Sequence, residues 1–321
     1  MSDEEGLTYA ATGVDIEESE AATAALVDAF GGFDADAYAG VIDLDDRVLG
    51  VATDGVGTKL LVAAAVGDHT TVGIDCVAMN VNDLVAMGIE PLGFVDYLAI
   101  DAPDEELSAQ LGEGLAQGAA AADMALLGGE TAVLPDIVTG YDLAGTCVGI
   151  AATDDLVGDA APGDQLVGIP STGIHSNGLT LARTALSREF DYDDPFPDDP
   201  DRTIGEELLT PTAIYSTVLE PLRRYASAAA HVTGGGWTNL SRMGDHRYEI
   251  GDPLPAQPIF SLVQDAGNVD DAEMHRTFNM GTGFVMAVPS PEAENLAADV
   301  EGRIIGEVTE GSGVAIRGIE L

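Results

Sequence analysis

The clearest pattern of apolar and polar positions lies in residues 73–87, GIDCVAMNVNDLVAM. Apolar side chains recur there at every third or fourth position, which is the spacing of one face of an α-helix. This apolar stripe consists of Ile74, Val77, Ala78, Val81, Leu84 and Val85. Gly88 follows and predicts the end of the helix, because glycine readily adopts the left-handed conformation found after helix C-termini.

The rest of the first half alternates short β runs with helical segments. Residues 19–30 predict a helix that stops at Gly31-Gly32, and an alanine-rich segment at about 104–122 predicts another. Runs of apolar and β-branched residues between turn residues predict strands. These strands cover 41–44, 48–53, 92–100, 125–127 and 141–152.

An acidic break with glycine and proline, TDDLVGDAAPGD at 153–164, separates two halves of the chain. The second half restarts with a strand at 165–170, the loop STGIHSNG and a helix; TGGG, another helix and the strand FVMAV come later. Residues 189–203, EFDYDDPFPDDPDRT, are acidic and proline-rich, which predicts a solvated loop. Strands and helices mixed in both halves predict an α/β (α+β) protein of two domains, 1–155 and 163–321.

The chain is strongly acidic but has the apolar content of a folded protein. It contains 12 Lys and Arg against 56 Asp and Glu, a net charge of −44, while 46% of its residues are hydrophobic. Such a surface repels itself in dilute salt. At about 1 M salt the screening length falls to roughly 3 Å, and the repulsion becomes tolerable. We therefore expect a halophilic protein of a salt-rich cytoplasm.

Composition also disfavours several classes of partner and location. Few cations are available to neutralise phosphates, which argues against binding nucleic acid or an anionic membrane surface. The start, MSDEEGLTYAATG, resembles no signal peptide, and no apolar run approaches the roughly 18 residues of a membrane span. Cys76 and Cys147 are isolated in sequence and predict buried thiols in a reducing compartment. The expected location is cytoplasmic.

The stretch TDGVGTKL contains Lys59, the only lysine among 321 residues. It follows a predicted strand, and its glycines would let backbone N–H groups approach an anion at the start of a helix. Lys59 could meet phosphate oxygens as a point charge, and Asp54 could hold magnesium. The alternative is a tight turn with a solvated lysine.

Three polar residues, Asp75, Asn82 and Asp83, lie off the apolar stripe of the 73–87 helix. Carboxylates on a helix usually form its solvated face. A second aspartate close to the glycine loop nevertheless suits magnesium, which takes one or two carboxylates and completes its shell with water and phosphates. Glu130, in LLGGETA, adds a carboxylate at a strand end, where α/β proteins often place site residues.

Three glycine loops of the second half carry polar residues. GIHSNG presents His175, Ser176 and Asn177 before a helix, which suits phosphate or amide recognition. HVTGGGWTN spans 231–239, and FNMGTG brings Asn279 to a strand entry. Each of these loops could also be a plain turn. No Ser-His-Asp spacing, H-E-x-x-H motif or Cys/His cluster supports an acyl-enzyme or zinc mechanism.

An ordered set of motifs resembles the phosphoribosylformylglycinamidine cyclo-ligase family, the aminoimidazole ribonucleotide synthetases of purine biosynthesis. The set runs from residue 9 to about 288 and comprises YAATGVDIE, TDGVGTKL, GIDCVAMNVNDLVAMGIEPLGFVDY, LLGGETA, YDLAGTCVGI, GIHSNGLTLAR, TPTAIY, HVTGGGWTN and FNMGTG. The resemblance implies ATP-dependent closure of formylglycinamidine ribonucleotide to aminoimidazole ribonucleotide, with release of ADP and phosphate. It also implies a homodimer whose N-terminal sheets combine into a β-barrel, with the C-terminal α/β domains beside it.

The resemblance and the residue patterns together predict four groups of site residues, with ATP and Mg²⁺ as cofactors. The catalytic group is Lys59, Asp54 and His175. The ATP and phosphate group is Gly55, Gly57, Thr58, Lys59, Asp75 and Asn82. The substrate group is His175, Ser176, Asn177 and Asn279, and the metal group is Asp54, Asp83 and Glu130.

The chain departs from the family pattern at three loops. GGFDADAYAG, with Asp34 and Asp36, is poorer in glycine than the family's GGFGG; GGETAVLP and TGGGWTN each lack a usual glutamate. The alternatives within the superfamily are thiamine-monophosphate kinase and selenophosphate synthetase. The kinase would lack HSNG and FNMG in this arrangement, and the synthetase normally carries a reactive cysteine or selenocysteine near its N-terminus, where this chain has none. A non-catalytic nucleotide-binding dimer is the alternative outside enzymes.

Overall fold

Two β-sheets, each built from one half of the chain, organise the protein. The computed structural model describes residues 6–14, 21–25 and 37–321. The first sheet has the order β1-β2-β5-β3-β4, antiparallel except for the parallel pair β3 and β4. Its strands are β1 (Gly40–Leu44), β2 (Arg47–Gly55), β3 (Glu90–Ile100), β4 (Ala125–Val133) and β5 (Tyr141–Ala152).

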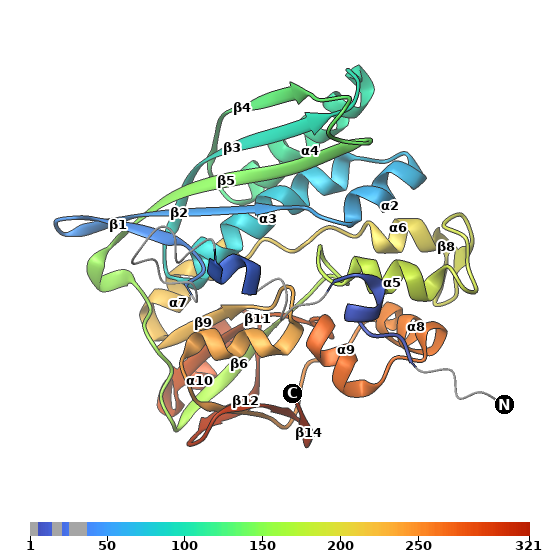
Figure 1. The fold of residues 1–321 in the computed structure, drawn as a ribbon. Helices are drawn as coiled ribbons and strands as arrows, with labels where there is room; N and C mark the ends of the chain where they lie inside the picture. The colour runs from blue at the N-terminus through green and yellow to red at the C-terminus, as the bar shows by residue number, and fades with distance from the viewer. Residues whose placement is uncertain (1–5, 15–20, 26–36) are drawn as a thin grey trace.

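Helices cover one face of this sheet (Figure 1). They are α2 (Lys59–Val66), α3 (Thr70–Ala86) and α4 (Glu105–Ala121). Alternate residues of β5 are buried, beginning with Leu143, so every second side chain faces these helices and the others face away. The face away from the helices exposes large apolar side chains, including Val95, Tyr97 and Leu127.

The second sheet has seven strands in the order β14-β13-β10-β12-β6-β11-β9. The strands are β6 (Asp164–Pro170), β9 (Ala228–His231), β10 (Arg247–Ile250), β11 (Thr282–Pro289), β12 (Arg303–Thr309), β13 (Gly313–Ile316) and β14 (Ile319–Glu320). The longer helices of the second half are α5 (Leu179–Leu186), α7 (Leu219–Tyr225), α8 (Pro258–Gly267), α9 (Asp271–Thr277) and α10 (Ala293–Asp299). A 3₁₀ segment, η4 (Gly236–Met243), follows β9.

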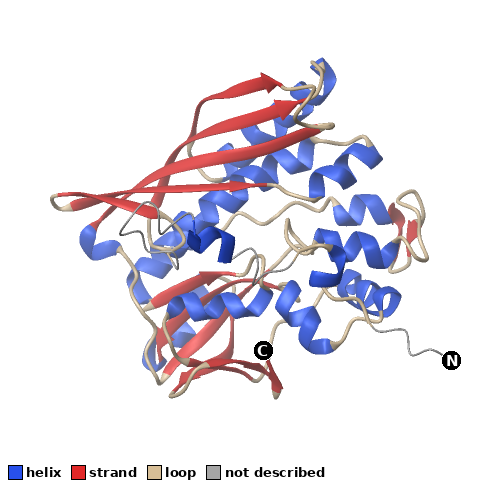
Figure 2. Cartoon of the chain, viewed as in Figure 1, coloured by secondary structure: helices blue, strands red, loops and turns tan. Residues whose placement is uncertain are grey.

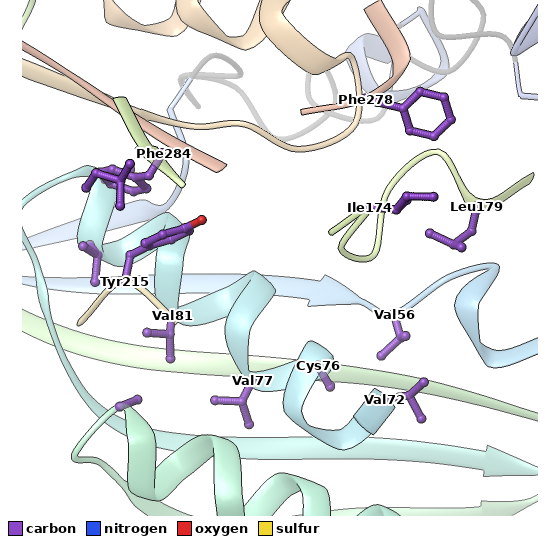
Figure 3. Packing of buried hydrophobic residues seen from close by; sticks show 14 of the residues in the cluster. Val56, Val72, Cys76, Val77, Val81, Ile174, Leu179, Tyr215, Phe278 and Phe284 are labelled. Atoms are coloured by element: carbon purple, nitrogen blue, oxygen red, sulfur yellow. The ribbon is translucent and has the colours of Figure 1, made fainter. Parts of the chain in front are cut away.

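Helix α3 lies between the two sheets (Figure 2). Thirteen of its seventeen residues are buried, including Asp75 and Asn82, because the first sheet packs on one side and second-half segments on the other. Figure 3 shows Val77 and Val81 of α3 on one side of this core, with Tyr215 and Phe284 of the second half close by. One hydrophobic cluster therefore joins both halves.

Most predicted elements are confirmed, and two need comment. Residues 21–25 are helical, and the rest of the predicted 19–30 helix lies outside the described residues, as do Asp34 and Asp36. Residues 189–203, predicted as a solvated loop without a packed element, are mostly exposed but contain a hairpin: β7 (Pro195–Phe196) pairs with β8 (Asp199–Thr203), and Phe196 is buried. Burial of the Phe196 ring stabilises this hairpin, which the acidic composition of the segment did not predict. None of the described helices has both the length and the apolar character needed to cross a bilayer.

Candidate active site at the junction of the two sheets

Asp83 on α3 and His231 at the end of β9 form a polar pair between the two halves. Oδ1 of Asp83 lies 3.0 Å from Nδ1 of His231. The imidazole is buried, whereas the Asp83 side chain keeps 17% exposure. Oδ1 of Asp83 is therefore bound to His231, while the Asp83 side chain remains partly exposed to solvent.

The hydrogen bonds of His231 indicate its tautomer. Nδ2 of Asn82 lies 3.3 Å from Nε2 of His231, and an amide nitrogen can only donate. Nε2 is then the acceptor, so in the neutral ring the proton is on Nδ1 and points at Asp83. This arrangement orients Asp83 through an N–H···O bond, as the supporting groups around metal-binding side chains do.

Asp54 faces the same region from the end of β2. Asp54 keeps exposed surface, but the surrounding protein reduces its hydration, and this effect together with the nearby Asp83 carboxylate raises its pKa to about 6. The Gly55 N–H, which donates to Asp54 at 2.7 Å, acts against the shift. His231 and Arg242 also act against it. The Asp83 carboxylate thus disfavours ionisation of Asp54, and a bound cation would favour it.

Lys59 opens α2, but its ammonium points inward. Nζ lies 2.7 Å from Oδ2 of Asp75 and donates to the carbonyl of Thr210 at 2.6 Å, and neither charged side chain has exposed surface. Oδ1 of Asp75 accepts from the N–H and hydroxyl of Thr212 at 2.7 and 2.6 Å. Burial lowers the pKa of Lys59, and Asp75 opposes that shift. Contrary to expectation, this geometry does not present Lys59 or Asp75 to a phosphate.

Asn82 is enclosed in the same way. Its Nδ2 donates to the carbonyl of Ala213 at 2.8 Å, and its Oδ1 accepts from the N–H of Tyr215 at 2.8 Å. The predicted phosphate contact of Asn82 is therefore replaced by contacts to the second half. Lys59, Asp75 and Asn82 together bind residues 210–215, an irregular segment that we call the strap, to α2 and α3.

The glycine turn that precedes α2 is the part of TDGVGTKL that remains open. Gly57 has a φ of 71°, a conformation that favours glycine, and is exposed. Thr58 is the N-cap residue, and its Oγ1 lies 2.8 Å from Oγ1 of Thr180 on α5. Gly55, Gly57 and Thr58 thus place backbone groups at the first turn of a helix, where N–H groups lack intrahelical acceptors.

The GIHSNG loop is mostly internal. Nε2 of His175 accepts from the backbone N–H of Thr172 at 3.1 Å, and the ring is 2% exposed. Burial, together with nearby His231 and Lys59, holds the pKa of His175 well below its usual value. The predicted catalytic role of His175 finds no open ring nitrogen at Nε2, because that atom braces the loop.

The other loop residues differ in accessibility. Ser176 is buried, with its Oγ 3.2 Å from Oγ1 of Thr212, whereas Asn177 is partly exposed and its Nδ2 lies 3.8 Å from Sδ of Met79. Asn279 is 3% exposed, and its Oδ1 accepts from Ser171 Oγ at 2.8 Å while its Nδ2 donates to Gly173 O at 2.9 Å. Asn279 therefore holds the loop in shape, and Asn177 is the member left open to a ligand.

Glu130 is not brought to the carboxylate pair. The register pairs Glu130 with Tyr97, and paired residues share a face of a sheet. Tyr97 is 46% exposed on the face away from α3, whereas Asp83 is on α3 itself. Accordingly, no group of three metal-ligating side chains occurs among the described residues. Of the three residues predicted to bind metal, Asp54 and Asp83 lie close enough to interact, and Glu130 lies apart from them.

Sequence reasoning missed His231 and the strap. His231 stands directly before the glycines of HVTGGGWTN, so its place beside a glycine loop was a usable signal. The strap motif TPTAIY carries Thr212, but nothing local indicates that its backbone meets a carboxylate 137 positions earlier.

Comparisons with known proteins cover nearly the whole chain. Two family descriptions match: "AIR synthase related protein, N-terminal domain" over residues 36–151, and its C-terminal counterpart over 161–319. The chain is 46% identical to phosphoribosylformylglycinamidine cyclo-ligase of Methanosarcina acetivorans over 327 residues, covering 98% of both chains. The Pyrococcus horikoshii protein of the same name is 44% identical over 308 residues, covering 90% of both.

A solved structure shares the fold at low identity. Thiamine monophosphate kinase from Aquifex aeolicus superposes with a TM-score of 0.69 at 17% identity, covering 96% of this chain and 99% of the other. At that identity the likeness concerns the fold alone.

Proposed function

Because this chain belongs to the phosphoribosylformylglycinamidine cyclo-ligase family, we propose that it closes formylglycinamidine ribonucleotide to aminoimidazole ribonucleotide at the expense of ATP. The formyl amide oxygen accepts the γ-phosphoryl group of ATP, and ADP leaves. The amidine nitrogen then attacks the formyl carbon that carries this oxygen, and phosphate leaves. The observation that carries the proposal is 46% identity to a named cyclo-ligase over 98% of the chain.

The carboxylate pair fits a magnesium ion. Magnesium accepts one or two carboxylates with water and phosphate oxygens around them. Asp54 and Asp83 supply two such groups, and the nearby Asp83 carboxylate contributes to raising the pKa of Asp54. A bound magnesium would supply charge neutralisation for phosphoryl transfer. His231 would keep Asp83 oriented toward it.

We place the phosphates of ATP beside the turn formed by Gly55, Gly57 and Thr58. The first turn of α2 offers backbone N–H groups and the positive end of the helix dipole. Asn177, on the facing GIHSNG loop, is the amide that can reach the substrate. Lys59, Asp75, His175 and Asn279 would act by holding these loops and the strap in position rather than by touching the reactants.

We further propose a homodimer formed through the open face of the first sheet. Large apolar side chains line that face, and Val95, Tyr97 and Leu127 are 40%, 46% and 64% exposed. A contiguous apolar surface on a chain of charge −44 favours association with another copy, and screening by molar salt permits it. We infer a salt-rich cytoplasm as the setting. Sedimentation at high and low KCl tests the dimer; a monomer at all salt concentrations would contradict it.

The experiment that tests the function incubates the purified chain with formylglycinamidine ribonucleotide, ATP and MgCl₂ in molar KCl. We expect formation of the aminoimidazole product with one ADP per turnover. Asp83→Asn is the matched inactive control, since it keeps the shape of the side chain. Phosphorylation of thiamine monophosphate instead would identify a kinase, and nucleotide binding without either product would identify a non-catalytic dimer.

A further inference from the structure

A cavity of about 530 Å³ lies next to the Asp83–His231 pair and has no role in the arrangement above. Its lining includes Ala86, one turn after Asp83 on α3, and Ala229, two residues before His231 on β9. Tyr38, Gly158 and the last turn of η4 close it from other sides. The volume lies within the usual range for pockets that hold small molecules.

Arg242, at the end of η4, supplies a positive charge at this cavity. Its Cζ lies 4.6 Å from the centre of the Tyr38 ring, within the range of a cation–π contact. The hydroxyl of Tyr38 in turn donates to the carbonyl of His231 at 3.2 Å. A cation–π contact uses the face of the tyrosine ring and does not occupy the five N–H donors of a guanidinium, which suit a planar acceptor.

Arg242 lines the cavity without forming an ion pair among the described residues. The ion pairs of the described residues involve five other arginines, and Arg242 is in none of them. Arg317, which lines another cavity, lies 4.0 Å from Asp252. An arginine that lines a cavity without forming an ion pair is available to an external anion.

Two carboxylates on the cavity lining, Asp159 and Asp245, narrow the class of ligand. Ionised carboxylates only accept hydrogen bonds, so they would repel a simple dianion but receive sugar hydroxyl groups. Carboxylates that bind ribose hydroxyls are a recurring feature of nucleotide sites. One cation and two carboxylate acceptors around the same cavity match the phosphate and the hydroxyl groups of a ribose phosphate.

We propose that the Arg242–Tyr38 cavity binds the ribose-phosphate portion of a nucleotide. Arg242 contacts the phosphate, and Asp159 and Asp245 accept from the ribose hydroxyls. Assignment of this nucleotide as formylglycinamidine ribonucleotide rests on the proposed function, whereas the sugar-phosphate site itself does not. ATP is the other source of the same chemistry.

The test compares Arg242→Ala with Arg224→Ala, a matched control. Arg224 also stacks on a tyrosine, with its Cζ 5.6 Å from the Tyr225 ring, but it does not line the cavity. At constant KCl we expect Arg242→Ala to raise KM for formylglycinamidine ribonucleotide about 10- to 100-fold, the size of a lost charged hydrogen bond. KM for ATP should stay within about twofold. Arg242→Lys should give an intermediate value, because lysine keeps charge without the fork.

A binding measurement separates this proposal from the proposed function. Calorimetric titration with ribose 5-phosphate should show binding to the wild-type chain and to Arg224→Ala, and a loss of at least about tenfold in Arg242→Ala. That result supports the site even if no cyclisation is found. If Arg242→Ala raised KM for ATP and left KM for formylglycinamidine ribonucleotide unchanged, the site would be assigned to ATP. Unchanged KM values and unchanged ribose 5-phosphate binding in a folded Arg242→Ala would overturn the proposal.

Discussion

Nζ of Lys59 lies 2.7 Å from Oδ2 of Asp75, and the two side chains have no exposed surface. The lysine is at the start of α2, the aspartate is inside α3, and both contact the strap of the second half. The pair therefore joins three segments at one buried point. A compact ammonium can meet a carboxylate and a carbonyl there, whereas a planar guanidinium needs more room.

Removing one charge of this pair should be costly. Lys59→Met leaves Asp75 buried without its cation, and we expect the free energy of unfolding to fall by about 3–5 kcal/mol. Lys59→Met combined with Asp75→Asn removes both charges and should recover part of that loss. Denaturant unfolding at fixed high KCl measures both variants. If the double variant is no more stable than Lys59→Met, the ion pair does not explain the burial.

Lys59→Arg distinguishes a structural lysine from a phosphate ligand. The larger guanidinium must fit a site with no exposed surface, so we expect a stability loss of roughly 1–3 kcal/mol from overpacking. KM for ATP should change little in the folded fraction. Thermal unfolding and steady-state kinetics on the same preparation provide the comparison. Unchanged stability with a large loss of kcat/KM would instead favour direct contact with phosphate.

His231 should control the magnesium dependence of the reaction. His231→Ala removes the N–H that orients Asp83, and loss of such a supporting group typically weakens metal binding by about 10- to 100-fold. His231→Asn places an amide N–H near the position of Nδ1 and should restore part of the affinity. Activity as a function of MgCl₂ concentration measures the effect. Equal magnesium dependence in all three proteins would contradict the orienting role.

Protonation of Asp54 should determine how activity falls at low pH. Its pKa is raised to about 6, and magnesium needs the ionised carboxylate, so activity should fall as pH decreases through about 6. The effect on stability has the opposite direction. The folded state binds this proton more tightly than the unfolded state, so ionisation of Asp54 lowers stability as pH rises from about 4 to 6.

The variant Asp54→Asn lacks this titration. Without magnesium, we expect its melting temperature relative to wild type to increase between pH 4.5 and pH 7.5, while turnover is lost. The comparison uses thermal unfolding of both proteins at matched KCl, with EDTA present. A constant difference in melting temperature across that range would show that Asp54 does not titrate abnormally.

Local patterns in the sequence predicted most regular elements and the family. The predicted strand at 141–152 coincides with β5, and the stripe at 73–87 corresponds to α3, because side-chain periodicity reports which face of an element is buried. The hairpin near Phe196 was missed because the acidic composition around it outweighed a single buried ring. Motif order identified the family without any contact being known.

The sequence by itself determined where Asp54, Lys59 and Asp83 stand relative to strand ends and helix starts. Only the tertiary structure decided what each one touches. Asp83 meets His231 across 148 positions, and Asp75 meets Thr212 across 137. Periodicity places Asp75 off the apolar stripe of α3, where a solvated carboxylate is expected. The second half of the chain nevertheless covers that side of α3, and the buried Asp75 carboxylate pairs with Lys59. A burial pattern is local, whereas the partner of a buried charge depends on which distant segment packs against it.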